Sequence, residues 1–214
     1  MPRKATPKSS KRPDPSHAII ESALELAAER GWERVGLADI ADAAGLSLAE
    51  LREQFPSKTA ILAAHAAWVD GEVLAGRDPD MADRPATERL FDIVMKRFDV
   101  LNPHKAGLRA VLRSYRCDPE AMVCGSMTLR RSMRWMLEAA DLSTAGLQGR
   151  LRVKALGALY LSVLPVWLRD DSEDMARTMA ALDRRLKRLD GLARTLCRFA
   201  PRRTQANGAT AEAG

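Results

Sequence analysis

Residues 37–62 read LADIADAAGLSLAELREQFPSKTAIL, and this stretch decides the fold of the first part of the chain. Apolar residues recur three or four positions apart on both sides of Gly45-Leu46, which predicts two short amphipathic helices joined by a tight turn. Ser47 and Glu50 have the spacing of a capping box, in which a hydroxyl and a carboxylate satisfy free N–H groups at a helix start. Two short helices joined in this way form a helix-turn-helix, whose second helix can enter the major groove of DNA.

This stretch and its neighbours resemble the TetR family of repressors across roughly residues 13–73. The family pattern runs from an amphipathic helix ending in Gly-aromatic, through IA-x-x-AG-h-S and a short recognition helix, to F-x-SK-x-x-L. The matching positions are Gly31-Trp32, Ile40-Ala41, Ala44-Gly45-Leu46-Ser47, Phe55-Pro56-Ser57-Lys58 and Ile61-Leu62. The resemblance implies a three-helix DNA-binding unit on an all-α core that pairs as a homodimer.

The resemblance also implies which side chains face DNA. They are Ser47, Leu48, Ala49, Glu50, Arg52, Glu53, Gln54 and, as a phosphate contact at the start of the next helix, Lys58. Arg52 can pair with guanine and Gln54 with adenine. The chain departs from the family pattern because it lacks the tyrosine that usually grips the DNA backbone, and because Glu53 would face phosphates unfavourably. An alternative therefore stays open, in which this helix is a solvated part of a retained fold and does not bind DNA.

Charge is distributed unevenly along the chain. The net charge of +6 and a pI near 9.5 favour a nucleic-acid partner. Residues 1–15 hold five basic and one acidic side chain, a net of +4, whereas residues 16–75 hold four basic and ten acidic side chains, a net of −6. Because DNA affinity depends on neutralising phosphates, the acidic segment counts against tight DNA binding by that domain alone. The basic arm would supply part of the missing charge.

Helical periodicity runs along the whole chain and strand signals are nearly absent, so the predicted fold class is all-α. We expect a disordered basic arm over residues 1–15 and a TetR-like helix-turn-helix domain over 16–75, whose last helix is a linker. A break rich in glycine and proline follows, and then an α-helical ligand-binding and dimerisation domain over 86–200. Residues 201–214 are expected to form a disordered tail.

Three predictions about helix ends depend on single residues. Ser143 is predicted to cap an apolar helix that runs to about Arg169 and is bent or broken near Pro165. Ser172, followed by two acidic residues, is predicted to cap the final helix, which runs to about Phe199.

Two stretches of the second half, residues 90–113 and 167–189, are similar to a TetR-derived family involved in ubiquinone biosynthesis, which binds isoprenoid lipids and partner proteins. The points of likeness are Arg97-Phe98-Asp99, Pro103-His104-Lys105, Trp167 and Asp170-Asp171-Ser172. This resemblance implies an alternative function, that of a lipid-binding accessory protein that does not bind DNA and that contacts membranes peripherally. It would also explain an acidic recognition helix.

Broad or flexible apolar side chains gather on the helices predicted over residues 119–168. With the TetR resemblance, they predict a cavity for a small apolar effector. The predicted lining residues are Phe98, Met122, Met133, Trp135, Met136, Tyr160 and Trp167. Plain core packing is the alternative meaning of such a stripe.

An apolar stripe with basic neighbours marks the last predicted helix. It consists of Leu182, Leu186, Leu189, Leu192, Leu196 and Phe199. Such a stripe fits half of a homodimer interface or a helix lying on an anionic membrane surface. We favour the dimer, which is how the resembled repressors pair and which would place two recognition helices one DNA turn apart.

No pattern predicts a catalytic, cofactor or metal site. The sequence has no phosphate-binding glycine loop, no H-E-x-x-H and no nucleophile elbow. His17, His65 and His104 are far apart in the sequence, and we interpret each as structural or exposed. Three cysteines without C-x-x-C spacing favour free, buried thiols.

No apolar run reaches the roughly 18 residues that a membrane span needs, and the N-terminus has no apolar signal segment. The sequence therefore predicts a cytoplasmic, homodimeric TetR-type transcriptional regulator that is not an enzyme. Its expected partners are double-stranded operator DNA and a small apolar effector.

Overall fold

The computed structural model describes residues 15–115 and 118–199, with side chains up to Gly191. Almost all of the predicted basic arm and the whole predicted tail lie outside these residues. Every regular element in the described ranges is helical, which confirms the all-α fold class. The α-helices are α1 (Pro15–Arg30), α2 (Leu37–Ala43), α3 (Leu48–Gln54), α4 (Lys58–Ala75), α5 (Ala86–Leu101), α6 (Lys105–Ser114), α7 (Pro119–Ala139), α8 (Gly146–Trp167) and α9 (Ala176–Phe199). Short 3-10 turns are η1 (Trp32–Arg34), η2 (Pro79–Met81) and η3 (Asn102–His104).

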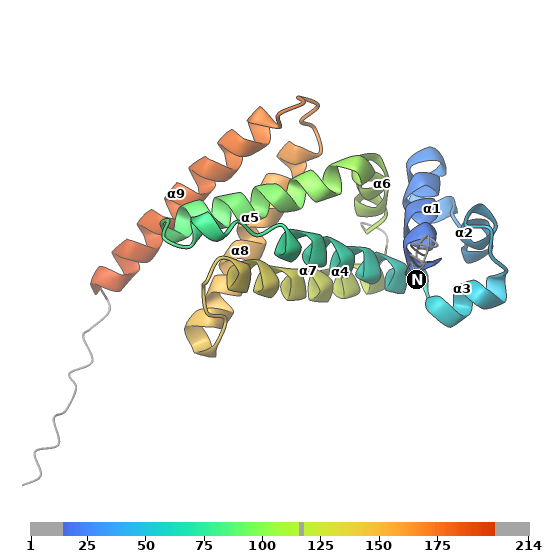
Figure 1. The fold of residues 1–214 in the computed structure, drawn as a ribbon, viewed down its shortest axis with the longest axis horizontal. Helices are drawn as coiled ribbons and strands as arrows, with labels where there is room; N and C mark the ends of the chain where they lie inside the picture. The colour runs from blue at the N-terminus through green and yellow to red at the C-terminus, as the bar shows by residue number, and fades with distance from the viewer. Residues whose placement is uncertain (1–14, 116–117, 200–214) are drawn as a thin grey trace, which may run out of the picture.

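Helices α1 to α3 form a small unit at one end of the molecule, and the later helices form an elongated body beside it (Figure 1). α4 leads from the small unit into the body, alongside α7, while α6 lies against α1. The small unit is therefore attached to the body at two places. None of the described helices is long and apolar enough to cross a bilayer.

Two separate hydrophobic cores explain this arrangement, and α4 contributes to both. Its N-terminal half places Ile61 in the core of the small unit, and its C-terminal half places Val69 and Val73 in the core of the body. α6 adds Val111 to the core of the small unit, although it comes from the second half of the fold. α4 and α6 therefore connect the packing of the body with the packing of α1–α3.

The contact between α1 and α6 depends on a glycine. Gly107 of α6 lies so close to α1 that a Cβ atom in its place would come within 2.3 Å of the carbonyl oxygen of Leu24. No real Cβ tolerates that distance, and the atom it would meet is backbone. Glycine is therefore the residue that permits the two helices to pack this closely.

A buried ion pair links three helices of the body. The guanidinium of Arg97 (α5) donates through Nη1 to Asp70 Oδ1 (α4), and the two residues are each 4% exposed. Ser132 (α7) is fully buried; its hydroxyl donates to Asp70 Oδ2 over 2.8 Å and accepts from Arg97 Nη2 over 3.2 Å. This closed polar network fixes the position of α4 within an otherwise apolar core.

α8 differs from the prediction at its N-cap and at Pro165. The helix begins at Gly146 with Ala145 as its N-cap, while the Ser143 hydroxyl accepts a hydrogen bond only from the N–H of Ala145, over 3.2 Å. Pro165 does not break the helix, which continues to Trp167. Proline is tolerated there because it lies near the helix end and because Leu161, whose carbonyl loses a partner, is half-exposed to water.

The start of α9 also differs from the prediction. The helix begins at Ala176, four residues after Ser172. Met175 has a φ of +50°, in the left-handed region, so a right-handed helix cannot run through it from Ser172. The Ser172 hydroxyl still accepts from the N–H of Ala176, over 3.2 Å, and it donates to Asp170 Oδ1 over 2.5 Å.

The apolar stripe of α9 serves the chain's own core in its described part. Leu182 and Leu186 are 0% and 4% exposed, and Leu189 packs against the same cluster. The side chains of Leu192, Leu196 and Phe199 lie outside the described residues. Large exposed apolar side chains occur instead on α3, α7 and α8; those of α8 are Leu147, Leu151 and Leu161.

Candidate nucleic-acid interface and apolar cavity

The helix-turn-helix forms as its sequence predicts. α2 ends at Ala43, and Gly45 turns the chain with a φ of +70°, a conformation that glycine adopts without strain. The N–H of Leu46 closes the turn on the carbonyl of Ala41, over 2.9 Å. Leu51 is the buried anchor of α3, with no exposed surface, and it fixes which face of that helix points outward.

The capping box at the start of α3 is complete. Glu50 accepts hydrogen bonds from the backbone N–H of Ser47 over 2.8 Å and from its hydroxyl over 2.7 Å. The N–H of Glu50 donates to the Ser47 hydroxyl over 3.2 Å. These bonds from Ser47 lower the pKa of Glu50. Glu50 therefore stabilises the helix start and holds a fixed negative charge there.

Every side chain of α3 that was expected to face DNA is exposed. These residues are Ser47, Leu48, Ala49, Glu50, Arg52, Glu53 and Gln54. Gln54 Oε1 accepts a hydrogen bond from the Ser16 hydroxyl of α1, over 3.3 Å. The exposed face thus offers one cation, two carboxylates and an amide, so its chemistry suits base contacts at Arg52 and Gln54 better than general attraction to phosphates.

Lys58 is differently placed from the expected phosphate contact. Its ammonium donates to the carbonyls of Trp32 and Val35, over 2.6 and 2.7 Å, and lies 4.3 Å from the centre of the Trp32 ring. Partial burial lowers the pKa of Lys58. This side chain therefore joins the start of α4 to the segment around η1, and phosphate would have to compete with two short hydrogen bonds.

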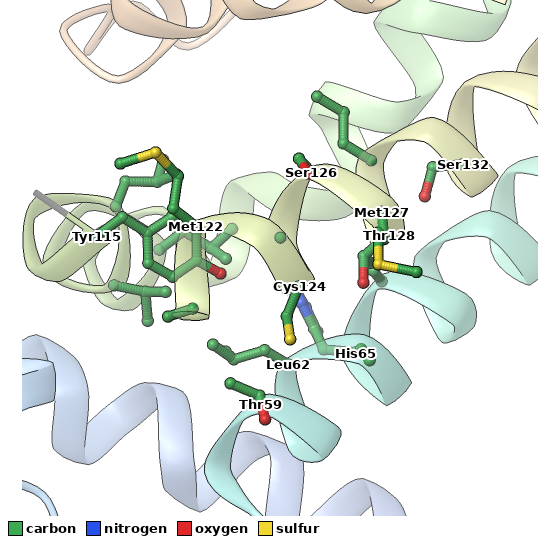
Figure 2. A pocket seen from close by; sticks show the side chains of 18 of the residues that line it. Thr59, Leu62, His65, Tyr115, Met122, Cys124, Ser126, Met127, Thr128 and Ser132 are labelled. Carbon is green, nitrogen blue, oxygen red and sulfur yellow. The ribbon is translucent and has the colours of Figure 1, made fainter. Parts of the chain in front are cut away.

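An apolar cavity of about 730 Å³ opens between α4, α6, α7 and α8, next to the small unit. Figure 2 shows side chains from α4, such as Leu62 and His65, and from α7, such as Met122 and Met127, gathered around it. Its volume is in the range of pockets for small molecules, and its lining is mostly apolar.

The predicted lining is corrected in part. Met122, Tyr160 and Trp167 line the cavity. Phe98, Met133 and Met136 have no exposed surface and pack in the adjoining core instead, and Trp135 is 49% exposed elsewhere on α7. The reason is the length of α7: its residues from Ala121 to Ser132 pass the cavity, and the following turns enter the core.

α4 and α6 also line the cavity, which was not predicted from the sequence. Thr59, Leu62 and His65 come from α4, and Leu108 and Leu112 come from α6. Each helix has an amphipathic pattern that indicates a buried face, but no local signal says that four such faces leave a space between them.

The expectation of buried thiols is wrong for Cys124. This cysteine lies at the cavity, and its side chain is exposed. The side chains of Cys117 and Cys197 lie outside the described residues, so the expectation stays a prediction for them.

Three nitrogens of the cavity lining have no hydrogen-bond partner within the part of the chain that the structure describes. They are Nε2 of His65, Nε of Arg97 and Nε1 of Trp167. The three residues are 3%, 4% and 0% exposed. Each of these atoms has almost no accessible surface, so the missing hydrogen bonds are a cost of the packing beside the cavity.

Aromatic contacts join side chains of α5 and α8 beside the cavity. The Phe98 ring lies 5.1 Å from that of Tyr160 and 5.4 Å from that of Trp167, between centroids. The Arg97 guanidinium lies 5.8 Å from the centre of the Tyr160 ring. Arg97 and Phe98 of α5 therefore pack against Tyr160 and Trp167 of α8 beside the cavity.

The three histidines, interpreted separately from the sequence, come together around Trp68. The ring of His17 lies 5.0 Å from Trp68, and the ring of His65 lies 6.1 Å from Trp68 and 5.5 Å from His104. They come from α1, α4 and η3, where the small unit meets the body. Over the described residues, no group of three or more histidine, cysteine or acidic side chains is arranged to hold a metal ion.

Acidification is expected to destabilise the protein through His65. Burial, reinforced by nearby His104, Arg97 and His17, lowers the pKa of His65 from 6.5 to about 3. Below about pH 6.5 His65 is therefore protonated in the unfolded chain but not in the folded protein. The free energy of unfolding falls as the pH falls for this reason. Between pH 7.5 and 5.5 we expect His65 to remove about 1 kcal/mol from the free energy of unfolding, measured with urea.

The matched variant for this measurement is His65→Gln, which cannot take up a proton. The pKa of His104 is also lowered by burial, and His104 titrates in both proteins, so the difference between them isolates His65. Equal losses in the wild type and in His65→Gln would contradict the prediction.

The comparisons with known proteins fit this geometry. Residues 19–65 match the family described as bacterial regulatory proteins, tetR family. The chain carries a TetR-family helix-turn-helix domain. Residues 152–193, which cover most of α8 and the greater part of α9, match the COQ9 family. These matches confirm the resemblance to TetR regulators and, over residues 167–189, the resemblance to the ubiquinone-biosynthesis family. The likeness over residues 90–113 lies outside the matched residues and stays a prediction. Comparison with curated protein sequences gives no significant match.

Solved TetR regulators share this fold over about four fifths of the chain. A TetR transcriptional regulator from Nitrosomonas europaea is 29% identical, with a TM-score of 0.69, over 83% of this chain and 99% of its own. One from Rhodococcus is 20% identical, with a TM-score of 0.59, over 82% of this chain and 95% of its own. The described fold is therefore that of solved TetR regulators. Since TetR regulators are non-enzymatic, these similarities agree with the expectation that this protein is not an enzyme.

Proposed function

We propose that this TetR-type protein binds operator DNA through α3 and that a small apolar molecule in the cavity changes its affinity for DNA. The main support for this proposal is that α4 contacts both the cavity and the core of the helix-turn-helix unit. Leu62 lines the cavity, while its neighbour Ile61 packs in the core of the helix-turn-helix unit. A molecule that occupies the cavity therefore touches the helix that holds the DNA-binding unit in place.

The coupling follows from differential binding. A molecule that fits the cavity better in one position of α4 than in another stabilises that position, and α1–α3 move with it. In a dimer, the separation of the two α3 helices must match successive turns of the major groove. An effector that favours a different separation weakens operator binding, and by the same linkage DNA weakens effector binding.

A homodimer is part of this proposal. The exposed side chains of Leu147, Leu151 and Leu161 lie three to four residues, or multiples of that, apart on one side of α8. Exposed leucines at such spacing favour burial against a second copy of the same helix. Cytoplasmic location belongs to the same proposal, since the operator is there.

The test of DNA binding is a pull-down of fragmented genomic DNA with the purified protein at moderate salt, read by sequencing. We expect enrichment of a palindromic sequence, and about a tenfold or greater loss of affinity for it in Arg52→Ala, because Arg52 is the one exposed cation of α3. Arg184→Ala is the matched control, since it removes the same charge from the exposed surface of α9.

The outcomes separate specific binding from charge effects. Equal losses in Arg52→Ala and Arg184→Ala would indicate a general electrostatic contribution and contradict base contact by α3. The absence of any enriched sequence in the wild type would contradict operator binding altogether.

A second candidate function has its own observations. The COQ9 match covers α8, which supplies Tyr160, Leu164 and Trp167 to the cavity, and the acidic balance of residues 16–75 disfavours DNA. These features support a lipid-binding accessory protein in ubiquinone biosynthesis that uses the helix-turn-helix only as scaffold and contacts membranes peripherally. Co-purification of a lipid, liposome binding and no enriched DNA sequence would favour it. A lipid-free protein without liposome affinity would exclude it.

A further inference from the structure

We propose that the cavity binds a long-chain monocarboxylate, whose hydrocarbon chain lies among the apolar side chains and whose carboxylate pairs with Arg131 of α7. The inference rests on the proposed role of the cavity as an effector site, and it specifies the chemistry of the effector. The apolar part of the effector is then the chain, and its charged end lies at the edge of the cavity.

The charged side chains of the cavity lining leave one positive charge uncompensated. None of the described lining residues is acidic, and the two arginines among them are Arg97 and Arg131. Arg97 is buried and paired with Asp70, so it adds no net charge. Burial lowers the pKa of His65 to about 3, so that imidazole is uncharged at neutral pH. Arg131, by contrast, forms no ion pair or hydrogen bond with another described residue.

The sequence of α7 explains why Arg131 has no partner on its own helix. Side chains pair along a helix with neighbours three or four positions away, and those of Arg131 are methionine, threonine, arginine and tryptophan. The two acidic residues of α7, Glu120 and Glu138, lie near its ends. Arg130 and Arg134 are also exposed, so this part of α7 attracts anions.

The position of Arg131 suits the charged end of a ligand. It lines the cavity and is exposed, so a carboxylate beside it keeps part of its hydration and avoids the cost of a fully buried charge. The planar guanidinium can donate two parallel hydrogen bonds to a carboxylate. Thr128, one helical turn earlier, lines the same cavity (Figure 2), and its hydroxyl has no hydrogen-bond partner among the described residues. It offers a further donor on this side of α7.

The interior of the cavity suits a hydrocarbon chain. Leu62 of α4, Leu108 of α6 and Leu164 of α8 line it, together with alanine and methionine side chains, around a volume of about 730 Å³. Burial of successive CH₂ groups supplies affinity for any chain of this kind, whereas the ionic contact distinguishes one head group from another. The contribution of Arg131 can therefore be measured with ligands that differ only in the head group.

The test compares two probes of equal chain length, decanoate and decan-1-ol, at neutral pH, where only the first is charged. Each is titrated into the full-length protein that holds the fluorescent dye N-phenyl-1-naphthylamine, and displacement of the dye gives the affinity. We expect the wild type to bind decanoate more tightly than decan-1-ol. In Arg131→Gln, which loses the charge but keeps a polar side chain, the ratio of carboxylate to alcohol affinity should fall about threefold to tenfold.

Arg130→Gln is the matched control, because Arg130 is the adjacent exposed cation of α7 and does not line the cavity. It should leave the ratio nearly unchanged, and a ratio taken within one variant cancels any general loss of packing. An equal fall in both variants, an unchanged ratio in Arg131→Gln, or a wild type that binds the alcohol as tightly as the carboxylate would each overturn the assignment while leaving the effector site in place. Failure of the dye and of both probes to bind would overturn the effector part of the proposed function itself.

Discussion

Replacing Asp70 with alanine is expected to destabilise the protein by about 3–5 kcal/mol. The variant leaves the guanidinium of Arg97 buried in the core of the body without its counter-ion, and it also removes the acceptor for the Ser132 hydroxyl. Folded domains are stable by only about 5–15 kcal/mol in total, so this loss is a large fraction of the whole. Urea or guanidinium unfolding measures it.

The double variant Asp70→Ala/Arg97→Met separates the cost of an unpaired charge from the value of the pair. Removing both charges leaves a mostly apolar core, so most of the lost stability should return. If the double variant is no more stable than Asp70→Ala, the unpaired charge is not the cause. The double variant also remains measurable if Asp70→Ala does not fold.

Replacing Gly107 with alanine is expected to cost about 3 kcal/mol and to disturb DNA binding as well as stability. The new Cβ would meet the carbonyl oxygen of Leu24, which is backbone and cannot rotate away. α1 and α6 must therefore move apart, and overpacking of this kind costs about 1–3 kcal/mol or more. Since α1 belongs to the small unit and α6 to the body, the orientation of α3 changes with it.

Gly71→Ala is the matched control for this prediction. Gly71 is exposed on α4, and a Cβ in its place meets nothing within 4 Å among the described residues. There the same substitution should stabilise the helix by about 0.5–1 kcal/mol, because alanine loses less backbone entropy than glycine. Equal thermal unfolding of Gly107→Ala and the wild type would show that the two helices can separate without cost.

The acidic surface of the helix-turn-helix unit bears on how strongly an effector in the cavity would change DNA binding. An acidic domain has weak general affinity for DNA, so base contacts by a few residues such as Arg52 carry more of the discrimination. If both proposals hold, a small displacement of α3 would remove those contacts. Weak general binding would then make the response to an effector steep.

Local features were predictable from the sequence. The turn at Gly45, the capping box of Ser47 and Glu50, and the break before α5 each depend on residues within a few positions of one another. The predictions that Ser143 and Ser172 begin helices were wrong, because the backbone conformation of neighbouring residues sets the helix starts. Ala145 is the N-cap of α8, and Met175 has a left-handed φ directly before α9. A serine before an apolar run shows only that a side chain able to cap a helix is present, and it does not show at which residue the helix begins.

The sequence by itself determined the helical fold class, the helix-turn-helix and the outward face of α3, because periodicity and capping act within one or two helical turns. Only the tertiary structure decided that Lys58 bonds to Trp32 and Val35, that Asp70 pairs with Arg97, and that the histidines meet around Trp68. It also decided where the cavity lies and which buried nitrogens beside it have no hydrogen-bond partner among the described residues. Most of these features join residues more than 20 positions apart in the chain, and helical periodicity carries no information about which buried face meets which.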